Sequence, residues 1–144
     1  MTFLKLISHS DPSSQLIERL PEIYQDLSIF ADVLPGNEAS PVHPFGGFVL
    51  NINVVTRAHC DVKDLHVCLV LVIGQHTGGE LCLVEPGLVL RLRNGDMALF
   101  PSGCITHFNL HYKGIRSSLV LHSDGAGKAW ADNRNHWIGH GFMK

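Results

Sequence analysis

Histidine is the residue type with the most chemical potential in this chain, because it accounts for 10 of the 144 residues. Three histidines stand two positions before an aspartate: His9/Asp11, His59/Asp61 and His122/Asp124. Imidazole and carboxylate are both ligands of transition metals, so each pair could bind one. Chance alone predicts roughly half an occurrence, so context must separate the pairs. The first pair precedes a predicted helix and the last has no further strands behind it, so both are interpreted as surface or capping residues.

The pair His59/Asp61 has the context that a metal site requires. It follows residues 48–57, where apolar side chains recur at every second position, as in a strand whose faces differ. A two-histidine, one-carboxylate site for non-haem Fe(II) needs a close pair after one strand and a distant histidine on another, and it leaves three coordination positions open. His107 lies several predicted strands later. We therefore expect His59, Asp61 and His107 to be metal ligands.

Further polar residues are separated from this pair by an even number of positions, as residues on one face of a strand are. They are Asn51, Asn53 and Arg57. If the strand continued to Asp61, the alternation of side chains would place all of them on the face that carries both ligands. We expect these residues to line the same pocket, and Arg57 is the first candidate for contact with a substrate or co-substrate.

The last predicted hairpin supplies a second polar set. If Lys113-Gly114 is a two-residue turn, directly opposed residues share a face. The residues on one face are then His107, Asn109, Arg116 and Ser118, with His111 beside them. Arg116 would lie roughly 13 Å from His107, at about 3.4 Å per residue. It could bind the far carboxylate of a five-carbon dicarboxylate that chelates the metal, and Ser118 adds a hydroxyl donor.

The elements that must position these residues fall into two parts. Residues 11–30 are predicted to be helical, because capping residues precede apolar side chains spaced by three and four, with a break at Pro21. A loop rich in Pro and Gly covers residues 35–47. Strand-like runs then alternate with turns. These runs are residues 48–57, 67–74, 80–85, 88–93, 97–100, 105–112 and 115–122, with turns at 77–79, 85–87, 94–96, 101–103 and 113–114.

Short strands at this spacing predict a mainly β fold with an N-terminal helix, in which the strands form a double-stranded β-helix, or jelly-roll, barrel. A length of 144 residues is typical of a single domain. We expect residues 1–45 to form a helical support, residues 46–124 the jelly-roll core and residues 125–144 a docked tail that includes a short helix.

The composition predicts a folded intracellular protein. Hydrophobic residues make up 45% of the chain and charged residues 17%, which excludes a disordered segment. No run of about 18 apolar residues and no secretory signal is present, so we expect no membrane segment and a location in the nucleus or cytoplasm. The cysteines form no CxxC pair and are interpreted as reduced packing thiols: Cys60, Cys68, Cys82 and Cys104.

Charge is distributed unevenly along the chain. The first 90 residues carry 4 basic and 10 acidic residues, whereas residues 91–144 carry 7 basic and 3 acidic residues. The net charge of −2 therefore divides into −6 and +4. Such a distribution fits an anionic partner on one side, and it also fits an ordinary domain whose faces differ. No cluster of Lys and Arg is present, so the basic footprint for nucleic acid is weak.

Several motifs occur in an order that resembles the Fe(II)/2-oxoglutarate-dependent dioxygenase superfamily. They are His59-Cys-Asp61, Gly78-Gly79-Glu80-Leu81, Gly95-Asp96, Pro101, His107 and Arg116-Ser-Ser118. The resemblance covers about residues 46–124. Four longer stretches resemble the fungal branch of the TET/JBP-type oxygenases, which are related to enzymes that oxidise methyl groups of DNA bases. These stretches are GGFVLNINVVTRAHCD, TGGELCLVEPGLVLRLRNGDMALFPSG, ITHFNLHYKGIRSSLVLHSD and KAWADNRN.

The resemblance implies a 2-oxoglutarate-dependent dioxygenase that hydroxylates a C–H bond while O2 oxidises 2-oxoglutarate to succinate and CO2. Its implied cofactors are Fe(II) and 2-oxoglutarate, with ascorbate as a candidate reductant. The implied metal ligands are His59, Asp61 and His107, the co-substrate anchors are Arg116 and Ser118, and the other pocket residues are Asn51, Asn53, Arg57 and Asn109. The favoured substrate is the methyl group of a modified base of the 5-methylcytosine or thymine type, which implies a role in DNA demethylation.

Two alternatives stay open. The same chemistry could act on a small molecule or a protein side chain, as in the similar prolyl hydroxylases. The barrel could also be a non-catalytic binding module. The sequence predicts neither the oligomeric state nor whether a partner supplies substrate-binding elements.

Overall fold

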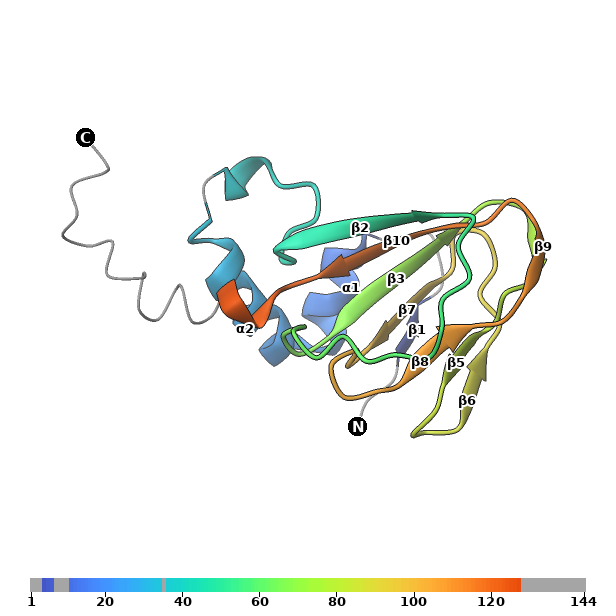
Figure 1. Ribbon diagram of the computed structural model, residues 1–144. Helices are drawn as coiled ribbons and strands as arrows, with labels where there is room; N and C mark the ends of the chain where they lie inside the picture. Colours follow the sequence, from blue (N-terminus) through green and yellow to red (C-terminus); the bar gives the residue numbers. More distant parts are fainter. Residues whose placement is uncertain (1–3, 7–10, 35, 128–144) are drawn as a thin grey trace.

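The computed structural model describes residues 4–6, 11–34 and 36–127 (Figure 1). The helices are α1 (Pro12–Arg19), α2 (Pro21–Ala31) and the single-turn 3₁₀ helix η1 (Asn37–Ala39). The strands are β1 (Leu4–Leu6), β2 (Gly47–Ile52), β3 (Cys68–Ile73), β4 (His76–Gly78), β5 (Leu81–Leu83), β6 (Leu88–Leu90), β7 (Met97–Phe100), β8 (His107–Asn109), β9 (Tyr112–Gly114) and β10 (Ser117–His122). The prediction of N-terminal helices followed by a strand-rich region is confirmed. Most of the predicted tail lies outside the described residues.

The N-terminal helical region divides where the sequence predicts a break. Asp11 caps α1, because its carboxylate accepts a hydrogen bond from the backbone N–H of Ser14 at 3.0 Å. Leu20 leaves the helical conformation with φ −140°. Pro21 then opens α2, since a proline has no N–H to donate and is tolerated in the first helical turn.

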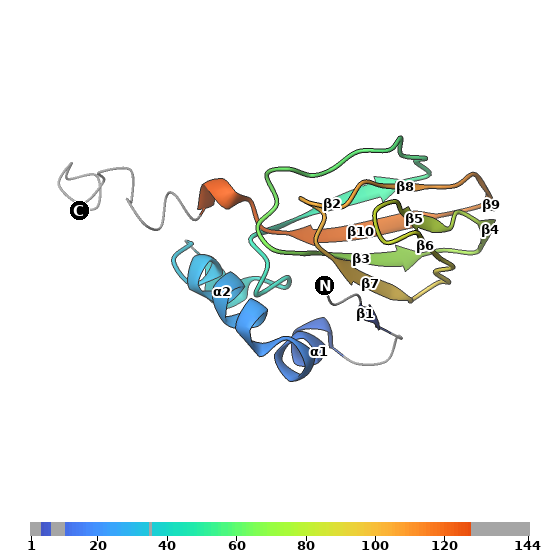
Figure 2. The same ribbon diagram turned by 90° about the horizontal axis from the view of Figure 1, so that it is seen from below.

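The strands form antiparallel sheets. A five-stranded sheet has the order β1-β7-β3-β10-β2, and a three-stranded sheet has the order β6-β5-β8. A third pair joins β4 to β9. Figure 2 shows α1 and α2 together on one side of the five-stranded sheet. The mainly β fold is confirmed, but among the described residues the three sheets are not hydrogen-bonded into one closed barrel.

The two-residue period of β3 separates two hydrophobic cores. Leu69 and Leu71 point toward the helices, where they pack with side chains such as Leu27 of α2. The alternate residues Val70 and Val72 pack in the opposite core, against the three-stranded sheet. Because β10 pairs with β3 in register, it follows the same alternation, with one face toward the helices and the other toward the small sheet.

The predicted hairpin around residues 113–114 is wrong. Lys113 and Gly114 belong to β9, which pairs with β4, and the predicted turn at Thr77-Gly78 is part of β4. The strand β8 pairs with β5, whereas β10 pairs with β2 and β3. Residues of β8 and β10 therefore meet across the space between two sheets and not within one hairpin.

The cysteines are all free, and two of them match the packing interpretation. Cys68 and Cys82 are buried, Cys60 is partly buried and Cys104 is exposed. Burial raises the pKa of the Cys68 thiol to about 12, which keeps it protonated. Among the described residues, no helix has the length and apolar character needed to cross a membrane.

The packing of α2 on the sheet can be tested with two residues of this helix. Leu27 is fully buried, at 0% exposure, whereas Ile29 is 58% exposed. Leu27→Ala should lower the free energy of unfolding by about 2–5 kcal/mol, because it leaves a cavity between helix and sheet. Ile29→Ala should change it by about 0.5 kcal/mol or less. Urea unfolding followed by circular dichroism measures both, and equal midpoints for the two variants would contradict this packing.

Candidate functional site

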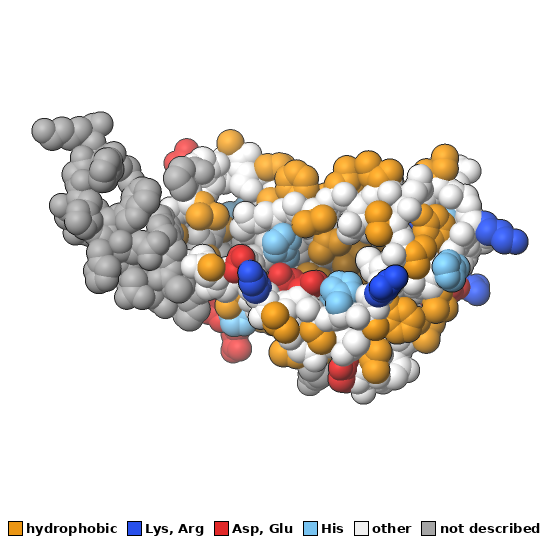
Figure 3. All heavy atoms as spheres, viewed as in Figure 1, with side chains coloured by type: hydrophobic (Ala, Val, Ile, Leu, Met, Phe, Trp, Pro, Cys, Tyr) orange, Lys and Arg blue, Asp and Glu red, His pale blue; other side chains and the backbone are white. Residues whose placement is uncertain are grey.

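A cavity of about 280 Å³ lies between the five-stranded sheet and β8. One wall is the inner face of β10, which contributes Ser118, Val120 and His122, and it is extended by Arg116, the residue just before this strand. Arg116 and His122 are six residues apart, so this wall is roughly 20 Å long at about 3.4 Å per residue. Figure 3 shows histidine and acidic side chains gathered around a hollow in the middle of this face of the molecule.

The opposite wall is held in place by backbone and side-chain ties between the segment 53–67 and β8. His59 and His107 form an isolated antiparallel bridge, with N–H···O distances of 3.1 and 2.9 Å. The backbone N–H and hydroxyl of Thr56 both donate to the amide oxygen of Asn109, at 2.9 and 2.6 Å. Asp61 donates its backbone N–H to the carbonyl of Ser102 at 3.0 Å. A segment without regular structure is thereby fixed against the small sheet.

These ties bring the three predicted metal ligands together. Ligand atoms of His59, Asp61 and His107 all lie within 4.8 Å of one another. The two oxygens of Asp61 face the two imidazoles, at 3.6 Å from His59 Nε2 and 3.4 Å from His107 Nε2. The imidazole rings lie 4.4 Å apart between centroids. Within the part of the chain that the structure describes, no other group of three such side chains converges in this way.

In both histidines, a hydrogen bond at Nδ1 leaves Nε2 to face the centre of the three-residue cluster. His59 Nδ1 lies 2.6 Å from the carbonyl oxygen of Arg57, and His107 Nδ1 lies 2.9 Å from that of Ile105. Because a carbonyl only accepts hydrogen bonds, each Nδ1 carries a proton and donates it. In the neutral rings both Nε2 lone pairs then point at the carboxylate of Asp61. A cation between them satisfies all these groups, and such outer hydrogen bonds are typical of metal-binding histidines.

The donor set suits a transition metal that keeps open coordination positions. Two imidazole nitrogens and one carboxylate on one side are the ligands expected for non-haem Fe(II). The His107 side chain is only 10% exposed, whereas those of His59 and Asp61 are 41% and 39% exposed. The cluster therefore has one buried member and two at the cavity mouth, where exogenous ligands can enter.

Arg116 places a second chemical group in the cavity. The residue is 5% exposed, and its Nε is buried without a hydrogen-bond partner among the described residues. Burial lowers the pKa of Arg116, although a guanidinium stays charged at neutral pH. An isolated buried cation is costly, so the site favours an anion. Ser118, also buried, is the next side chain along the same wall.

Of the predicted pocket asparagines, Asn53 does not line the cavity, and both Asn53 and Asn109 have structural partners. Asn53 adopts a positive φ of 52° after β2 ends at Ile52, so the strand does not continue toward Asp61. The side chain of Asn53 accepts the backbone N–H of Arg116 at 3.1 Å, and Asn53 donates its own N–H to Arg116 O at 2.8 Å. Asn109 lines the cavity while holding Thr56. Asn51 lines the cavity as predicted.

The expectation that one continuous strand aims five residues at one face is wrong, because β2 stops at Ile52. Arg57 is exposed and does not line the cavity, and what it contributes is the backbone carbonyl that accepts from His59. His111 is also exposed and outside the cavity, since β8 ends at Asn109. These two positions fall on irregular backbone, where the two-residue period no longer applies.

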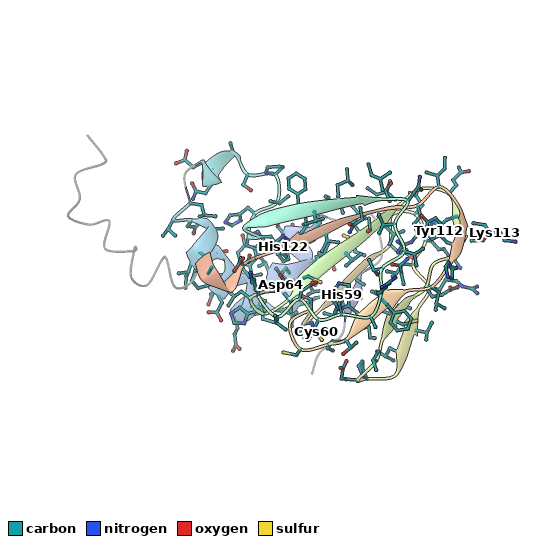
Figure 4. The ribbon with its side chains drawn as sticks, viewed as in Figure 1. His59, Cys60, Asp64, Tyr112, Lys113 and His122 are labelled. Atoms are coloured by element: carbon teal, nitrogen blue, oxygen red, sulfur yellow. The ribbon has the colours of Figure 1, made fainter. Side chains whose placement is uncertain are left out.

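Sequence reasoning missed a polar group at the other end of the wall. Asp64 accepts a hydrogen bond from Ser102 Oγ at 2.6 Å and lies 3.4 Å from His122 Nδ1. Both Asp64 and His122 line the cavity, and Figure 4 shows them side by side, away from Tyr112. The interpretation of His122 as a surface or capping residue is therefore wrong, because it lines the cavity beside Asp64. The signal was present, because His122 has the parity of Arg116 along one strand.

Comparisons with known proteins give a structural match only. No protein-family model matches the sequence, and no curated protein matches it. The structure titled NgTET1 in complex with 5mC DNA superposes with a TM-score of 0.68 over 80% of this chain, at 16% sequence identity. The chain shares the fold of NgTET1. It spans about half of that protein, 47% of its length. The resemblance to TET-type oxygenases is therefore confirmed at the level of the fold.

A second structure is a 2OG-Fe(II) oxygenase family oxidoreductase from Burkholderia pseudomallei. It matches with a TM-score of 0.43 at 20% identity, over 52% of this chain and 39% of that protein.

Metal binding can be tested at the buried member of the cluster. His107→Ala should weaken Mn(II) affinity by at least about tenfold, because it removes one of three converging ligands. The matched control is His111→Ala, which changes an exposed histidine outside the cavity and should stay within about twofold of the wild type. Isothermal titration calorimetry measures both affinities. Equal Mn(II) affinity in wild type and His107→Ala would exclude the cluster as the metal site.

Proposed function

We propose that this chain is an Fe(II)- and 2-oxoglutarate-dependent dioxygenase with a double-stranded β-helix (jelly-roll) fold, and that it hydroxylates a C–H bond. One observation carries the proposal: the cluster of His59, Asp61 and His107 opens into the same cavity as the buried Arg116, whose Nε has no hydrogen-bond partner among the described residues. A metal site alone would fit many functions. A metal site facing a buried cation suits a chelating co-substrate whose far end is a carboxylate.

Different residues of the cavity have different proposed roles. His59, Asp61 and His107 would hold the iron, which when bound supplies the O2-dependent oxidation of 2-oxoglutarate to succinate and CO2 and of the substrate C–H bond. Arg116 and Ser118 would bind the far carboxylate by charge and hydrogen bonding. Asn51 lies directly opposite Ser118 in the register of β2 and β10, which puts an amide beside the same ligand. Ascorbate would serve as an external reductant.

The end of the cavity at His122 is proposed as the substrate end. It carries two facing polar side chains that line the cavity, since His122 Nδ1 lies 3.4 Å from Asp64 Oδ1. Asp64 beside it is an acceptor, and an imidazole can donate or accept. Such a pair suits the polar edge of a nucleobase, so we propose the methyl group of a 5-methylcytosine- or thymine-type base as the oxidised group. A base would have to be flipped out or single-stranded to enter.

A second candidate is oxidation of a small molecule or a protein side chain. It is favoured by the scarcity of basic residues along one wall of the cavity. The strand β2, which forms part of the cavity wall, contains no basic residue. Phosphates bind where Lys and Arg gather, so this part of the rim offers little to a nucleic-acid backbone.

The proposed activity is tested by incubating the protein with Fe(II), 2-oxoglutarate and ascorbate. Separate reactions receive methylated DNA as duplex or single strand, free 5-methyldeoxycytidine, or a peptide and metabolite panel. We expect succinate formation stimulated by methylated single strands, with a gain of one oxygen atom on the base in mass spectra. His107→Ala should abolish both signals. Oxygen gained only by a peptide or metabolite would support the second candidate, and no succinate in any reaction would contradict both.

The proposed substrate end predicts that a substitution there changes substrate binding and leaves 2-oxoglutarate binding unchanged. His122→Ala should raise the KM for the oxidised substrate by about tenfold, which corresponds to one hydrogen bond to a polar group. The Kd of 2-oxoglutarate should stay within about twofold of the wild type, because Arg116 lies at the far end of the wall. Steady-state kinetics and calorimetry measure the two quantities. A larger loss in 2-oxoglutarate affinity than in substrate KM would refute this division of the cavity.

A further inference from the structure

The side chain of Arg116 is held by neighbours that do not line the cavity. Its backbone is fixed by the two hydrogen bonds to Asn53 described above. Its guanidinium carbon lies 5.9 Å from the centre of the Tyr112 ring, within the range of a cation–π interaction. Gly79 is buried against the same side chain. Neither Tyr112 nor Gly79 is among the cavity-lining residues.

Gly79 leaves the space that Arg116 and Tyr112 occupy. A Cβ atom added to Gly79 would lie 3.1 Å from Arg116 Cδ and Nε and 3.2 Å from Tyr112 Cβ. These separations are tighter than ordinary van der Waals contact, so any side chain at position 79 would displace the arginine or the ring. Gly79 also has a φ of +74°, a conformation that residues with a Cβ rarely adopt.

The ring of Tyr112 is itself positioned by the two-stranded sheet of β4 and β9. Tyr112 pairs with Gly78 in the register of this sheet, and the next N–H, of Gly79, donates to the carbonyl of His111 at 3.0 Å. The His76 ring meets the Tyr112 ring edge-on, at 6.3 Å between centroids. Figure 4 shows Tyr112 and the neighbouring Lys113 at the end of the molecule opposite His122.

We propose that Gly79 and Tyr112 are positioning residues that form a socket for the Arg116 guanidinium and so determine the affinity for the dicarboxylate co-substrate. The proposal rests on the function proposed above. The socket acts through Arg116 and is separate from the metal cluster, so disturbing it should weaken 2-oxoglutarate binding and leave metal binding unchanged. A buried cation gains the most from a carboxylate when its geometry is fixed in advance, because no ordering then accompanies binding.

The test compares two glycines that share a backbone conformation. Gly87 has a φ of +66°, close to that of Gly79, but a Cβ there would meet nothing within 4 Å. Both Gly79→Ala and Gly87→Ala add the same backbone strain, and only the first disturbs the socket. Calorimetry gives the Kd of Mn(II) and then the Kd of 2-oxoglutarate for the Mn(II)-loaded protein, without any turnover.

We expect Gly79→Ala to weaken 2-oxoglutarate binding by at least about tenfold, as overpacking of a tight contact does, and to leave Mn(II) affinity within about twofold. Gly87→Ala should leave both affinities within about twofold of the wild type. Equal 2-oxoglutarate affinity in the two variants would overturn the socket. If the wild type itself binds Mn(II) but no 2-oxoglutarate, the proposed function fails instead, which is a distinguishable result.

A second pair of variants keeps the proposal falsifiable if Gly79→Ala does not fold. Tyr112→Leu removes the ring and should weaken 2-oxoglutarate binding about three- to tenfold, whereas Tyr112→Phe keeps the ring and should restore affinity to within about twofold. If Tyr112 had only a structural role, its substitution would lower thermal stability, and Tyr112→Leu and Tyr112→Phe would not differ in 2-oxoglutarate affinity. Equal affinity in Tyr112→Leu and wild type would exclude the ring from the socket.

Discussion

The alternation of side chains along β10 is the constraint on which the rest of the molecule depends. This strand pairs with β2 on one side and β3 on the other, so its register is fixed twice. Leu119 and Leu121 pack toward the helices, which leaves the intervening positions for the cavity. A slip of one residue would bury Arg116 and His122 against the helices and open the hydrophobic core. Core packing and cavity chemistry are thus specified together by one strand.

The second requirement is that an irregular segment be held rigidly. Residues 53–67 carry two of the expected metal ligands on backbone that belongs to no strand, and the bridge between His59 and His107 ties them to the third. Asn109, two residues after His107, adds a second connection, because its amide oxygen accepts a hydrogen bond from the Thr56 hydroxyl. Loops that hold ligands usually need such support, since small displacements change coordination geometry. Here the support comes from β8, the strand that also carries the third expected ligand, His107.

Several polar groups of the cavity have partners in the protein, and one buried atom does not. Asp64 accepts a hydrogen bond from Ser102 and lies 3.4 Å from His122 Nδ1, and Asn109 accepts hydrogen bonds from Thr56. Arg116 Nε is buried without a hydrogen-bond partner among the described residues. Buried polar groups without partners are uncommon and call for an explanation. The proposed anionic co-substrate would provide one, because Arg116 Nε would then be available to it.

The sequence by itself determined the strand-rich core, the divided N-terminal helix and the residues of the cluster, because alternation and helical periodicity are properties of neighbouring residues. It also identified Arg116 and Ser118 as cavity residues, although through a hairpin that does not exist. The prediction of which side chains of β8 and β10 share a face was right, because this alternation does not depend on which strands they pair with. Only the tertiary structure decided that β8 and β10 face each other across two sheets, that Asn53 and Arg57 lie beyond the end of β2, and that Asp64 meets His122. Those outcomes depend on contacts between distant segments, which no local pattern contains.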